Sequence, residues 1–251
     1  MDFTINTYKD FLHALISQGY SFQTFEEFLI QPNSKTLILR HDVDLLPQNS
    51  LRFAKIQNEL GIKGSYYFRA VPESWNEKII LEISEMGHEV GYHYETMDTA
   101  KGDVDLAMDY FKMNLEKLRK LVDVNTICMH GSPLSKYDNK EIWKKYNYKE
   151  FGIIGEPYYD INYDQIYYLT DTGRKWDGHN VSVRDKVKTS FKQTFHTTDQ
   201  IIKALNNAAF PDQIMFTFHP QRWHDNYFLW TTELIAQNIK NVIKKFFYVK
   251  I

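Results

Sequence analysis

The segment from Lys35 to Asp44, KTLILRHDVD, constrains the fold more than any other part of the sequence. Residues 36–39 are apolar or β-branched, and they are followed at once by residues that can carry charge or bind a metal: Arg40, His41, Asp42 and Asp44. Short apolar runs of this kind are typical of strands buried in a parallel sheet. Active sites of parallel α/β folds lie at the carboxyl ends of such strands. The segment therefore predicts a buried strand that carries carboxylates into a functional site.

Asp42 and Asp44 are two residues apart, so their side chains project to the same side if the backbone stays extended. Two carboxylates in one cleft either divide the work of acid and base or share a cation. An exposed turn with a solvated acidic pair is the alternative interpretation. The buried strand before the pair and the histidines at later strand ends favour the functional one.

Strands and helices are expected to alternate along the rest of the chain, which predicts βαβ units and a parallel sheet. After the first strand, strands are expected at residues 64–69, 88–93, 125–129, 151–154, 165–169 and 213–218. Helices are expected at residues 47–60, 76–86, 103–121, 141–146, 198–207 and 227–245. Right-handed crossovers place all the strand ends on one face.

The N-terminal residues 1–34 are expected to form a helical leader that packs on the main domain, residues 35–251. Apolar residues recur at helical spacing in two short stretches, and Pro32 and Asn33 break the chain before the first strand. We assign no chemistry to this leader.

Composition excludes some classes of partner. The net charge is −2, so there is no basic footprint for nucleic acid. The aromatic fraction of 16% suits both a large core and stacking on sugars. Cys128 lies in the apolar run 126–129 and is expected to be a buried structural thiol. No run is long and apolar enough to span a membrane or resembles a secretion signal, so a cytoplasmic protein is expected; the oligomeric state is unknown.

Ionisable residues follow four of the expected strands. These are Asp42 with Asp44, His93 with Glu95, His130, and His219. A single histidine at a strand end is more often structural. Because parallel strands bring their carboxyl ends to one edge, the four ends together predict one shared cleft.

The order of short motifs resembles that of NodB-type polysaccharide deacetylases of the carbohydrate esterase 4 superfamily, in a divergent branch with an RHDVD motif. The matching stretches are RHDVD at 40–44, GHEVGYH at 87–93, HGSP at 130–133, DTGRKW at 171–176 and FH at 218–219. The resemblance covers about residues 36–223, and it implies an irregular (β/α)7-type barrel in a single α/β domain.

The resemblance also implies roles for individual residues. Asp42 corresponds to the general base and His219 to the general acid. Asp44 and His93 correspond to ligands of a divalent metal, Zn²⁺ with Co²⁺ or Mn²⁺ as alternatives. His88 matches a position that does not bind the metal.

One position departs from the family pattern. A second ligating histidine is usual four residues after the first, but this chain has Met97 there. A thioether is a poor ligand for a site built from oxygen and imidazole donors. Glu95 or His130 could supply the third ligand, and loss of metal binding is the other possibility.

The resemblance implies a metal-dependent carbohydrate deacetylase that removes an N- or O-acetyl group, in surface-polysaccharide biosynthesis. Residues expected to contact the sugar are Asp171, Arg174, Trp176, Arg222 and Trp223. For the two tryptophans, packing beneath the loops is an equal alternative. The alternatives for function are a catalytically inactive carbohydrate-binding protein of the same fold and a hydrolase of another small amide.

Overall fold

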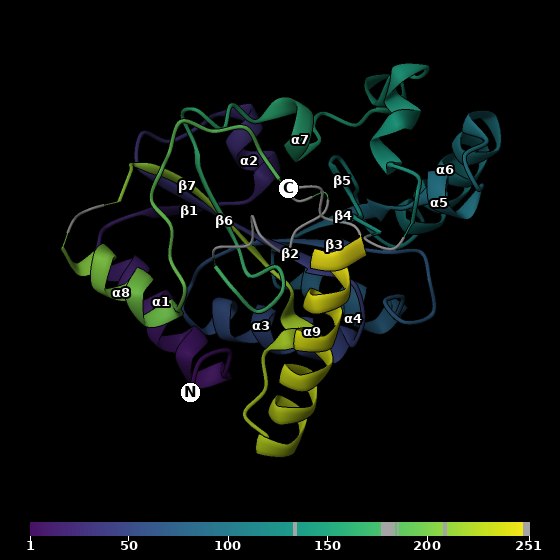
Figure 1. The fold of residues 1–251 in the computed structure, drawn as a ribbon. Helices are drawn as coiled ribbons and strands as arrows, with labels where there is room; N and C mark the ends of the chain where they lie inside the picture. The colour runs from purple at the N-terminus through teal and green to yellow at the C-terminus, as the bar shows by residue number, and fades with distance from the viewer. Residues whose placement is uncertain (133–134, 177–183, 185, 208–209, 248–251) are drawn as a thin grey trace.

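The computed structural model describes the chain except for residues 133–134, 177–183, 185, 208–209 and 248–251. Within the described part, a single seven-stranded parallel sheet runs through the molecule, and helices pack around it (Figure 1). The strands are β1 Ser21–Gln23, β2 Thr36–Val43, β3 Ser65–Phe68, β4 Glu89–Tyr94, β5 Ile127–Met129, β6 Tyr167–Thr170 and β7 Gln213–Phe218. The predicted parallel (β/α) architecture is confirmed.

Helices connect the strands. The α-helices are α1 Ile5–Ser17, α2 Phe25–Ile30, α3 Pro47–Glu59, α4 Glu77–Glu85, α5 Thr96–Thr99, α6 Val104–Arg119, α7 Pro157–Asp160, α8 Thr198–Asn206 and α9 Tyr227–Phe247. Short 3-10 helices are η1 Asn139–Lys144, η2 Tyr148–Phe151 and η4 Pro220–Arg222.

The strand order is β5-β4-β3-β2-β7-β6, with β1 paired to the first half of β2. Strand β2 is central because it also pairs with β3 and β7 along its length. In the described residues β5 and β6 are the two edges and do not pair with each other, so the barrel is incompletely closed.

The N-terminal segment is part of the same sheet and core. Its helices α1 and α2 were expected, but strand β1 between them was not, because three residues are too few to show a period. Phe11, Leu12 and Leu15 of α1 are fully buried, and α1 packs against α8 (Figure 1).

Residues 151–154 do not form the expected strand. Phe151 is the last residue of η2, and the Ile154 N–H donates to the carbonyl of Asn125 at 2.8 Å. A single parallel bridge pairs Thr126 with Gly155, so this segment touches the edge of the sheet without extending it.

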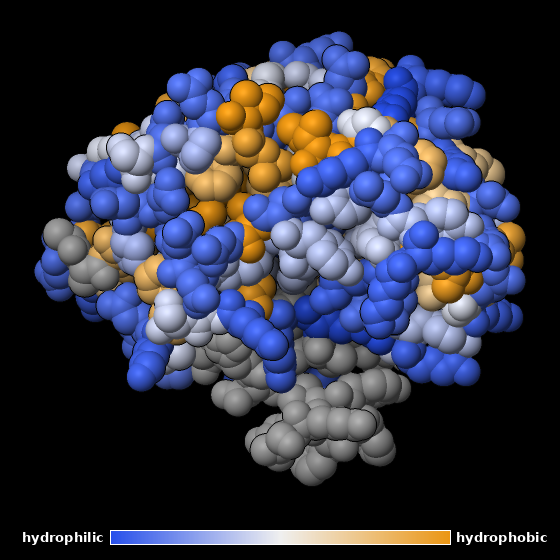
Figure 2. Space-filling view, turned by 90° about the horizontal axis from the view of Figure 1, so that it is seen from above, coloured by the Kyte–Doolittle hydropathy of each residue, from blue (hydrophilic) through white to orange (hydrophobic). Residues whose placement is uncertain are grey.

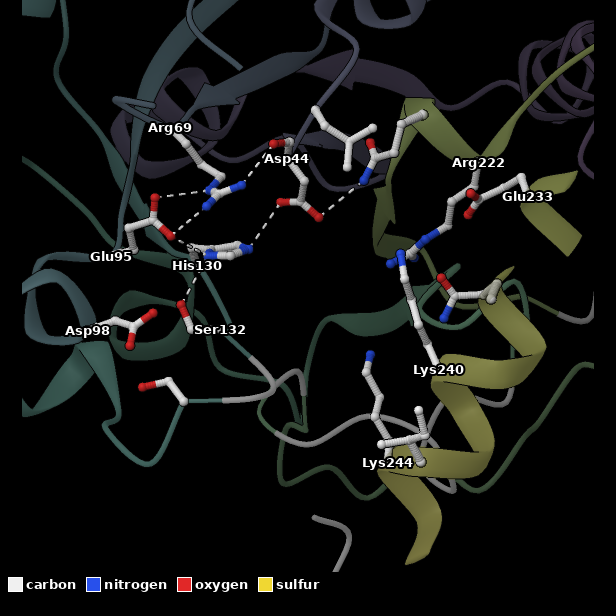
Figure 3. Close-up of a pocket in the computed structure, with 15 residues that line it drawn as sticks. Asp44, Arg69, Glu95, Asp98, His130, Ser132, Arg222, Glu233, Lys240 and Lys244 are labelled. Carbon is white, nitrogen blue, oxygen red and sulfur yellow. Dashed lines mark hydrogen bonds and ion pairs between the residues drawn. The ribbon is translucent and has the colours of Figure 1, made fainter. Parts of the chain in front are cut away.

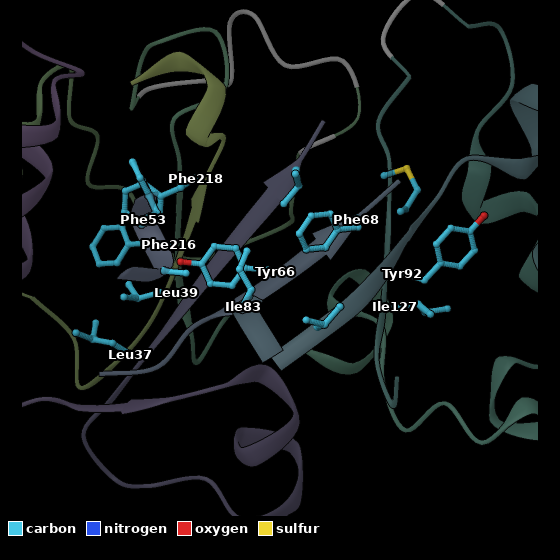
Figure 4. Packing of buried hydrophobic residues seen from close by; sticks show 14 of the residues in the cluster. Leu37, Leu39, Phe53, Tyr66, Phe68, Ile83, Tyr92, Ile127, Phe216 and Phe218 are labelled. Atoms are coloured by element: carbon cyan, nitrogen blue, oxygen red, sulfur yellow. The ribbon is translucent and has the colours of Figure 1, made fainter. Parts of the chain in front are cut away.

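Alternating side chains of the strands build two hydrophobic clusters. The outer cluster lies between sheet and helices and contains Leu37, Leu39, Tyr66, Phe216 and Phe218 among its members (Figure 4). The inner cluster fills the barrel. It consists of Phe25, Phe28, Ile38, Tyr67, Cys128, Ile161, Tyr163, Ile166, Tyr168 and Met215. Since Phe25 and Phe28 belong to α2, that helix closes the barrel at the amino ends of the strands.

The outer surface is mixed. Figure 2 shows the face that is uppermost in Figure 1, where hydrophilic residues cover most of the surface and hydrophobic residues gather in one patch. Such a mixture is ordinary for a globular protein. None of the helices in the described part of the chain combines the length and apolar character that a membrane crossing needs.

Glu156 makes stability depend on pH. Its carboxylate is buried, and it accepts hydrogen bonds from the Met129 N–H at 3.0 Å and the Tyr158 N–H at 2.6 Å. Burial raises the pKa of Glu156 from 4.5 to about 7, although both N–H groups oppose the shift. Because the pKa of Glu156 is higher in the folded state than in the unfolded state, its contribution to the free energy of unfolding is fully present below pH 4.5. The contribution is lost as the pH rises through about 7, where the buried carboxyl group ionises.

Between pH 5 and pH 8.5, the free energy of unfolding should fall by about 3 kcal/mol less in Glu156→Gln than in the unchanged protein. The size follows because one pKa unit corresponds to about 1.36 kcal/mol. Urea unfolding at both pH values measures this. Glu150→Gln, at an exposed position, is the control and should leave the difference unchanged. An equal pH dependence in Glu156→Gln and the unchanged protein would contradict the prediction.

Candidate active site

Three strands deliver nitrogen and oxygen ligands to one point at the carboxyl face. Asp44 follows β2, His93 lies in β4 and His130 follows β5. The Oδ1 atom of Asp44 is 3.5 Å from Nε2 of His93 and 3.5 Å from Nε2 of His130. Ligand atoms bound at about 2.0–2.1 Å to a tetrahedral zinc ion lie about 3.4 Å apart. The spacing of these three groups therefore fits one divalent metal ion.

Hydrogen bonds on the far side of both imidazole rings set which nitrogen is available. Nδ1 of His93 lies 2.9 Å from the carbonyl oxygen of Cys128, and Nδ1 of His130 lies 2.9 Å from Oε2 of Glu95. Each Nδ1 must donate to its oxygen partner, so each Nε2 presents its lone pair toward Asp44.

Asp44 completes the donor set. Its Oδ1 is buried and accepts no hydrogen bond from the described residues, whereas Oδ2 accepts one from Nε2 of Gln221 at 3.1 Å. Burial acts to raise the pKa of Asp44, but His130 and His93 outweigh it and hold the pKa well below the usual range. An ionised, unpartnered carboxylate oxygen between two imidazole lone pairs fits a bound cation.

Glu95 and His130 were alternative third ligands, and the structure gives them different positions. His130 is in the cluster, whereas Glu95 lies behind it, paired with the guanidinium of Arg69 at 2.8 Å (Figure 3). Arg69 also donates to the Asp44 carbonyl at 2.9 Å. Glu95 is thus placed to orient His130, as carboxylates behind metal-bound histidines do.

Met97 lies in α5 with 4% of its surface exposed, and it belongs to the outer hydrophobic cluster. The position where the family has a second histidine is therefore directed into the core. His130 comes from the neighbouring strand instead. The sequence marked His130 as a strand-end residue, but its distance from Asp44 depends on the pairing of β4 with β5.

Asp42 lies beside the cluster, inside the barrel. Arg40, two residues earlier on the same strand face, donates from Nε to Oδ1 at 2.9 Å and from Nη2 to Oδ2 at 2.7 Å. Both side chains are buried; burial acts to raise the pKa of Asp42, but Arg40, together with His93 and His219, lowers it to about 2. Oδ2 is 3.9 Å from Nε2 of His93. Arg40 was expected only as a charged residue at the end of the strand, and its pairing with Asp42 was not predicted.

His41, between Arg40 and Asp42, points to the opposite face. Its ring stacks on Tyr66, and its Nε2 lies 3.0 Å from Nε2 of Gln57. Burial lowers the pKa of His41 to about 3, so it is a neutral core residue.

His219 follows β7 on the other side of Asp44. Its Nδ1 lies 2.6 Å from Oδ1 of Asp171, and its Nε2 is 3.9 Å from Oδ2 of Asp44. Asp171 is fully buried and also accepts from Nη1 of Arg222 at 3.0 Å and Nε1 of Trp223 at 2.7 Å. Burial alone would raise the pKa of Asp171, but His219 and Arg222 hold it below the usual range. Asp171 therefore orients His219 and does not face a sugar.

Some of the residues expected to contact the sugar line the pocket, and others pack against neighbouring side chains. Arg222 lines the pocket at the site. Trp176 and Trp223 are 2% and 1% exposed, so neither offers a ring face for stacking on a sugar. The guanidinium of Arg174 lies over the Trp230 ring at 4.6 Å, and Nη1 donates to the Trp230 carbonyl. The alternative of packing beneath the loops holds for both tryptophans.

A pocket of about 400 Å³ opens beside the candidate metal-binding cluster of Asp44, His93 and His130; it lies between Arg69, Glu95 and His130 on one side and α9 on the other (Figure 3). A smaller cavity of about 60 Å³ reaches inward and is lined by Asp42, Asp44, His93, His130 and His219, among others. A small molecule in the larger pocket could thus extend one group to all five side chains.

No family model matches the chain, and no curated protein sequence matches it. Among solved structures, a family 4 carbohydrate esterase (CE4) pseudoenzyme from Bacillus anthracis, BA3943, is 15% identical, with a TM-score of 0.47 and coverage of 87% of this chain and 63% of that one. This chain thus spans less than two thirds of that protein's length.

A Streptococcus mutans CE4 esterase is 14% identical, with a TM-score of 0.46 and coverage of 93% and 92%. Bacillus subtilis PdaA, a family 4 carbohydrate esterase, is 14% identical, with a TM-score of 0.42 and coverage of 91% and 83%. The chain is similar to family 4 carbohydrate esterases.

We expect His130→Ala to lose stoichiometric zinc and Glu95→Gln to weaken zinc affinity about 10–100-fold, because Glu95 fixes the ring that binds. Elemental analysis and competition with a chromophoric chelator measure both effects. His13→Ala removes an exposed histidine of α1 and is the control. Full zinc content in His130→Ala with unchanged affinity would contradict this ligand assignment.

Proposed function

We propose that this protein is a metal-dependent hydrolase that removes an acyl group, most simply acetyl, from a carbohydrate. The observation that carries the proposal is the position of Asp42 and His219 on either side of the three-ligand cluster, at the inner end of one pocket. An acid and a base that flank a Lewis-acid site are the parts that amide or ester hydrolysis requires.

Asp44, His93 and His130 would hold the divalent ion. When bound, such an ion supplies Lewis acidity, polarising a carbonyl and lowering the pKa of a bound water from about 15.7 to about 7. Nitrogen and oxygen ligands of this number suit zinc, and they also accept cobalt or manganese.

Asp42 serves as the general base in this proposal. Its ion pair with Arg40 keeps it ionised, so it is able to take a proton from the attacking water. The water oxygen then bonds to the acyl carbon. The same ion pair holds the carboxylate in one orientation, which limits the entropy lost in reaching the reactive geometry.

His219 serves as the general acid. Because Nδ1 donates to Asp171, a proton on Nε2 faces the cavity. As the bond between the acyl carbon and the amine nitrogen or alkoxide oxygen breaks, this proton passes to the leaving group. Each proton transfer of this kind contributes about 10²–10⁴-fold to the rate. The cytoplasmic location and the biosynthetic role stay predictions from the sequence.

We expect Asp42→Asn to lower kcat at least 100-fold while zinc content stays stoichiometric, since the base is lost and the three ligands remain. Acetate release from N- and O-acetylated sugars, with added Zn²⁺, Co²⁺ or Mn²⁺, measures the activity. Asp10→Asn, at an exposed position of α1, is the matched control.

Asp42→Asn leaves the Arg40 charge buried without its partner, which costs about 3–5 kcal/mol in comparable pairs. The double variant Arg40→Gln, Asp42→Asn removes both charges and should be equally inactive but more stable than the single variant. No acetate release from the unchanged protein under any metal, or full activity in Asp42→Asn, would reject the deacetylase.

A further inference from the structure

Helix α9 packs on the barrel through a polar side. Gln237, Asn241 and Lys244 are buried on this side, and Asn241 donates to the Gly173 carbonyl at 2.8 Å and accepts from Gln237 at 2.8 Å. Figure 3 shows Lys240 and Lys244 extending from the helix on the side of the pocket, which both residues line. Polar contacts therefore hold the inner side of α9 in place.

The apolar side chains of α9 face outward. Seven of them are exposed, from 41% for Ile243 to 75% for Phe228: Tyr227, Phe228, Leu229, Ile235, Ile239, Val242 and Ile243. A surface helix of a globular protein normally turns its apolar stripe toward the core. Residues 227–244 contribute no side chain to either hydrophobic cluster, so this helix has the reverse orientation.

The exposed apolar area is larger than a monomer usually carries. Since an aromatic side chain has about 150–250 Å², the exposed fractions correspond to roughly 700 Å² for the seven residues together. The largest apolar patch on a typical monomer is about 300–600 Å². Two such faces packed together would cover about 1,400 Å², within the range of about 1,200–2,000 Å² for stable interfaces.

The spacing of the apolar residues suits a second helix as the partner. Positions 228, 232, 235, 239 and 242 are separated by four, three, four and three residues, which is the spacing of the seam between two paired helices. Thr232 is the one polar residue at these five positions. Its hydroxyl donates to the carbonyl of Phe228 at 2.9 Å, so it needs no hydrogen bond from a partner.

The same row of residues is compatible with a copy of itself. A two-fold axis brings the same surface of both copies together. None of the five positions carries a charge, so two identical faces meet without repulsion. A lipid surface fits less well, because interfacial helices present lysines to the headgroups, whereas Lys244 is buried and Lys240 lines the pocket.

We propose that this protein forms a dimer in which the outer faces of α9 from two copies pack against each other, with Ile235 and Ile239 near the centre of the interface. The other side of each helix lines the pocket, so the dimer holds one wall of the pocket in place in both copies. This inference concerns assembly and does not depend on the proposed function.

Sedimentation velocity over a range of protein concentrations tests the dimer. We expect the unchanged protein to dimerise with a Kd of about 1 µM or tighter, as interfaces of this size do. Ile239→Glu should weaken the association at least 100-fold, because it places two carboxylates in one apolar interface. Phe228→Glu, at the other end of the row, should act in the same direction.

Met113→Glu is the matched control. Met113 of α6 is 57% exposed, as Ile239 is, and its substitution should leave the dimer unchanged. Circular dichroism verifies that each variant is folded.

Variants of opposite charge distinguish a second copy from other occupants of this face. A mixture of Ile239→Lys and Ile239→Glu should form a mixed dimer more tightly than either variant associates with itself, because the two charges then attract. Neither a membrane nor an unrelated protein would produce this preference. Flotation with phosphatidylcholine and phosphatidylglycerol vesicles measures lipid binding separately.

Three outcomes would overturn the dimer. These are a monomeric unchanged protein well above about 1 µM, a dimer that persists in both Ile239→Glu and Phe228→Glu, and a mixture of the charged variants without preference for the mixed pair. A monomer that floats with vesicles, and no longer does so as Ile239→Glu, would assign the face to a membrane and would also overturn the dimer.

Discussion

Strand β2 divides the molecule into an outer core and an inner site, because successive side chains of a strand point to opposite faces. Leu37, Leu39 and His41 face the helices, whereas Arg40 and Asp42 face the inside of the barrel. Pairing with β1, β3 and β7 fixes the register of this strand. A shift of one residue would bury His41 in the site and expel both charged partners from it.

The inner side of the barrel changes from apolar to charged along its axis. Near the amino ends, Phe25 and Phe28 of α2 meet Ile38 and Met215. Above them comes the Arg40–Asp42 pair, with exposed fractions of 0% and 2%. A buried pair of this kind contributes little net stability, since desolvation of both ions offsets their attraction. Its effect is to hold an ionised carboxylate in one position next to the histidines.

The site is built from histidines that are each fixed by an oxygen on their far side. His93 uses a backbone carbonyl, His130 uses Glu95, and His219 uses Asp171. Each of these oxygen partners leaves Nε2 directed at the cavity. Met97, at the position where the family pattern has a second histidine, packs in the core, and His130 from the neighbouring strand lies beside Asp44 and His93 instead.

The sequence by itself determined the alternation of strands and helices, the strand ends that carry Asp42, Asp44, His93, His130 and His219, and the ordered motifs. These follow from local periodicity and from short runs of residues. The tertiary structure brought His130, and not Glu95, next to Asp44 and His93; it also buried Trp176 and Trp223, placed Asp171 behind His219 and brought Lys240 into the pocket. Each of these depends on distances between segments far apart in the chain, and on whether a side chain faces the core or the cleft. Local sequence does not encode those distances, because they arise only when the strands pair and the helices pack.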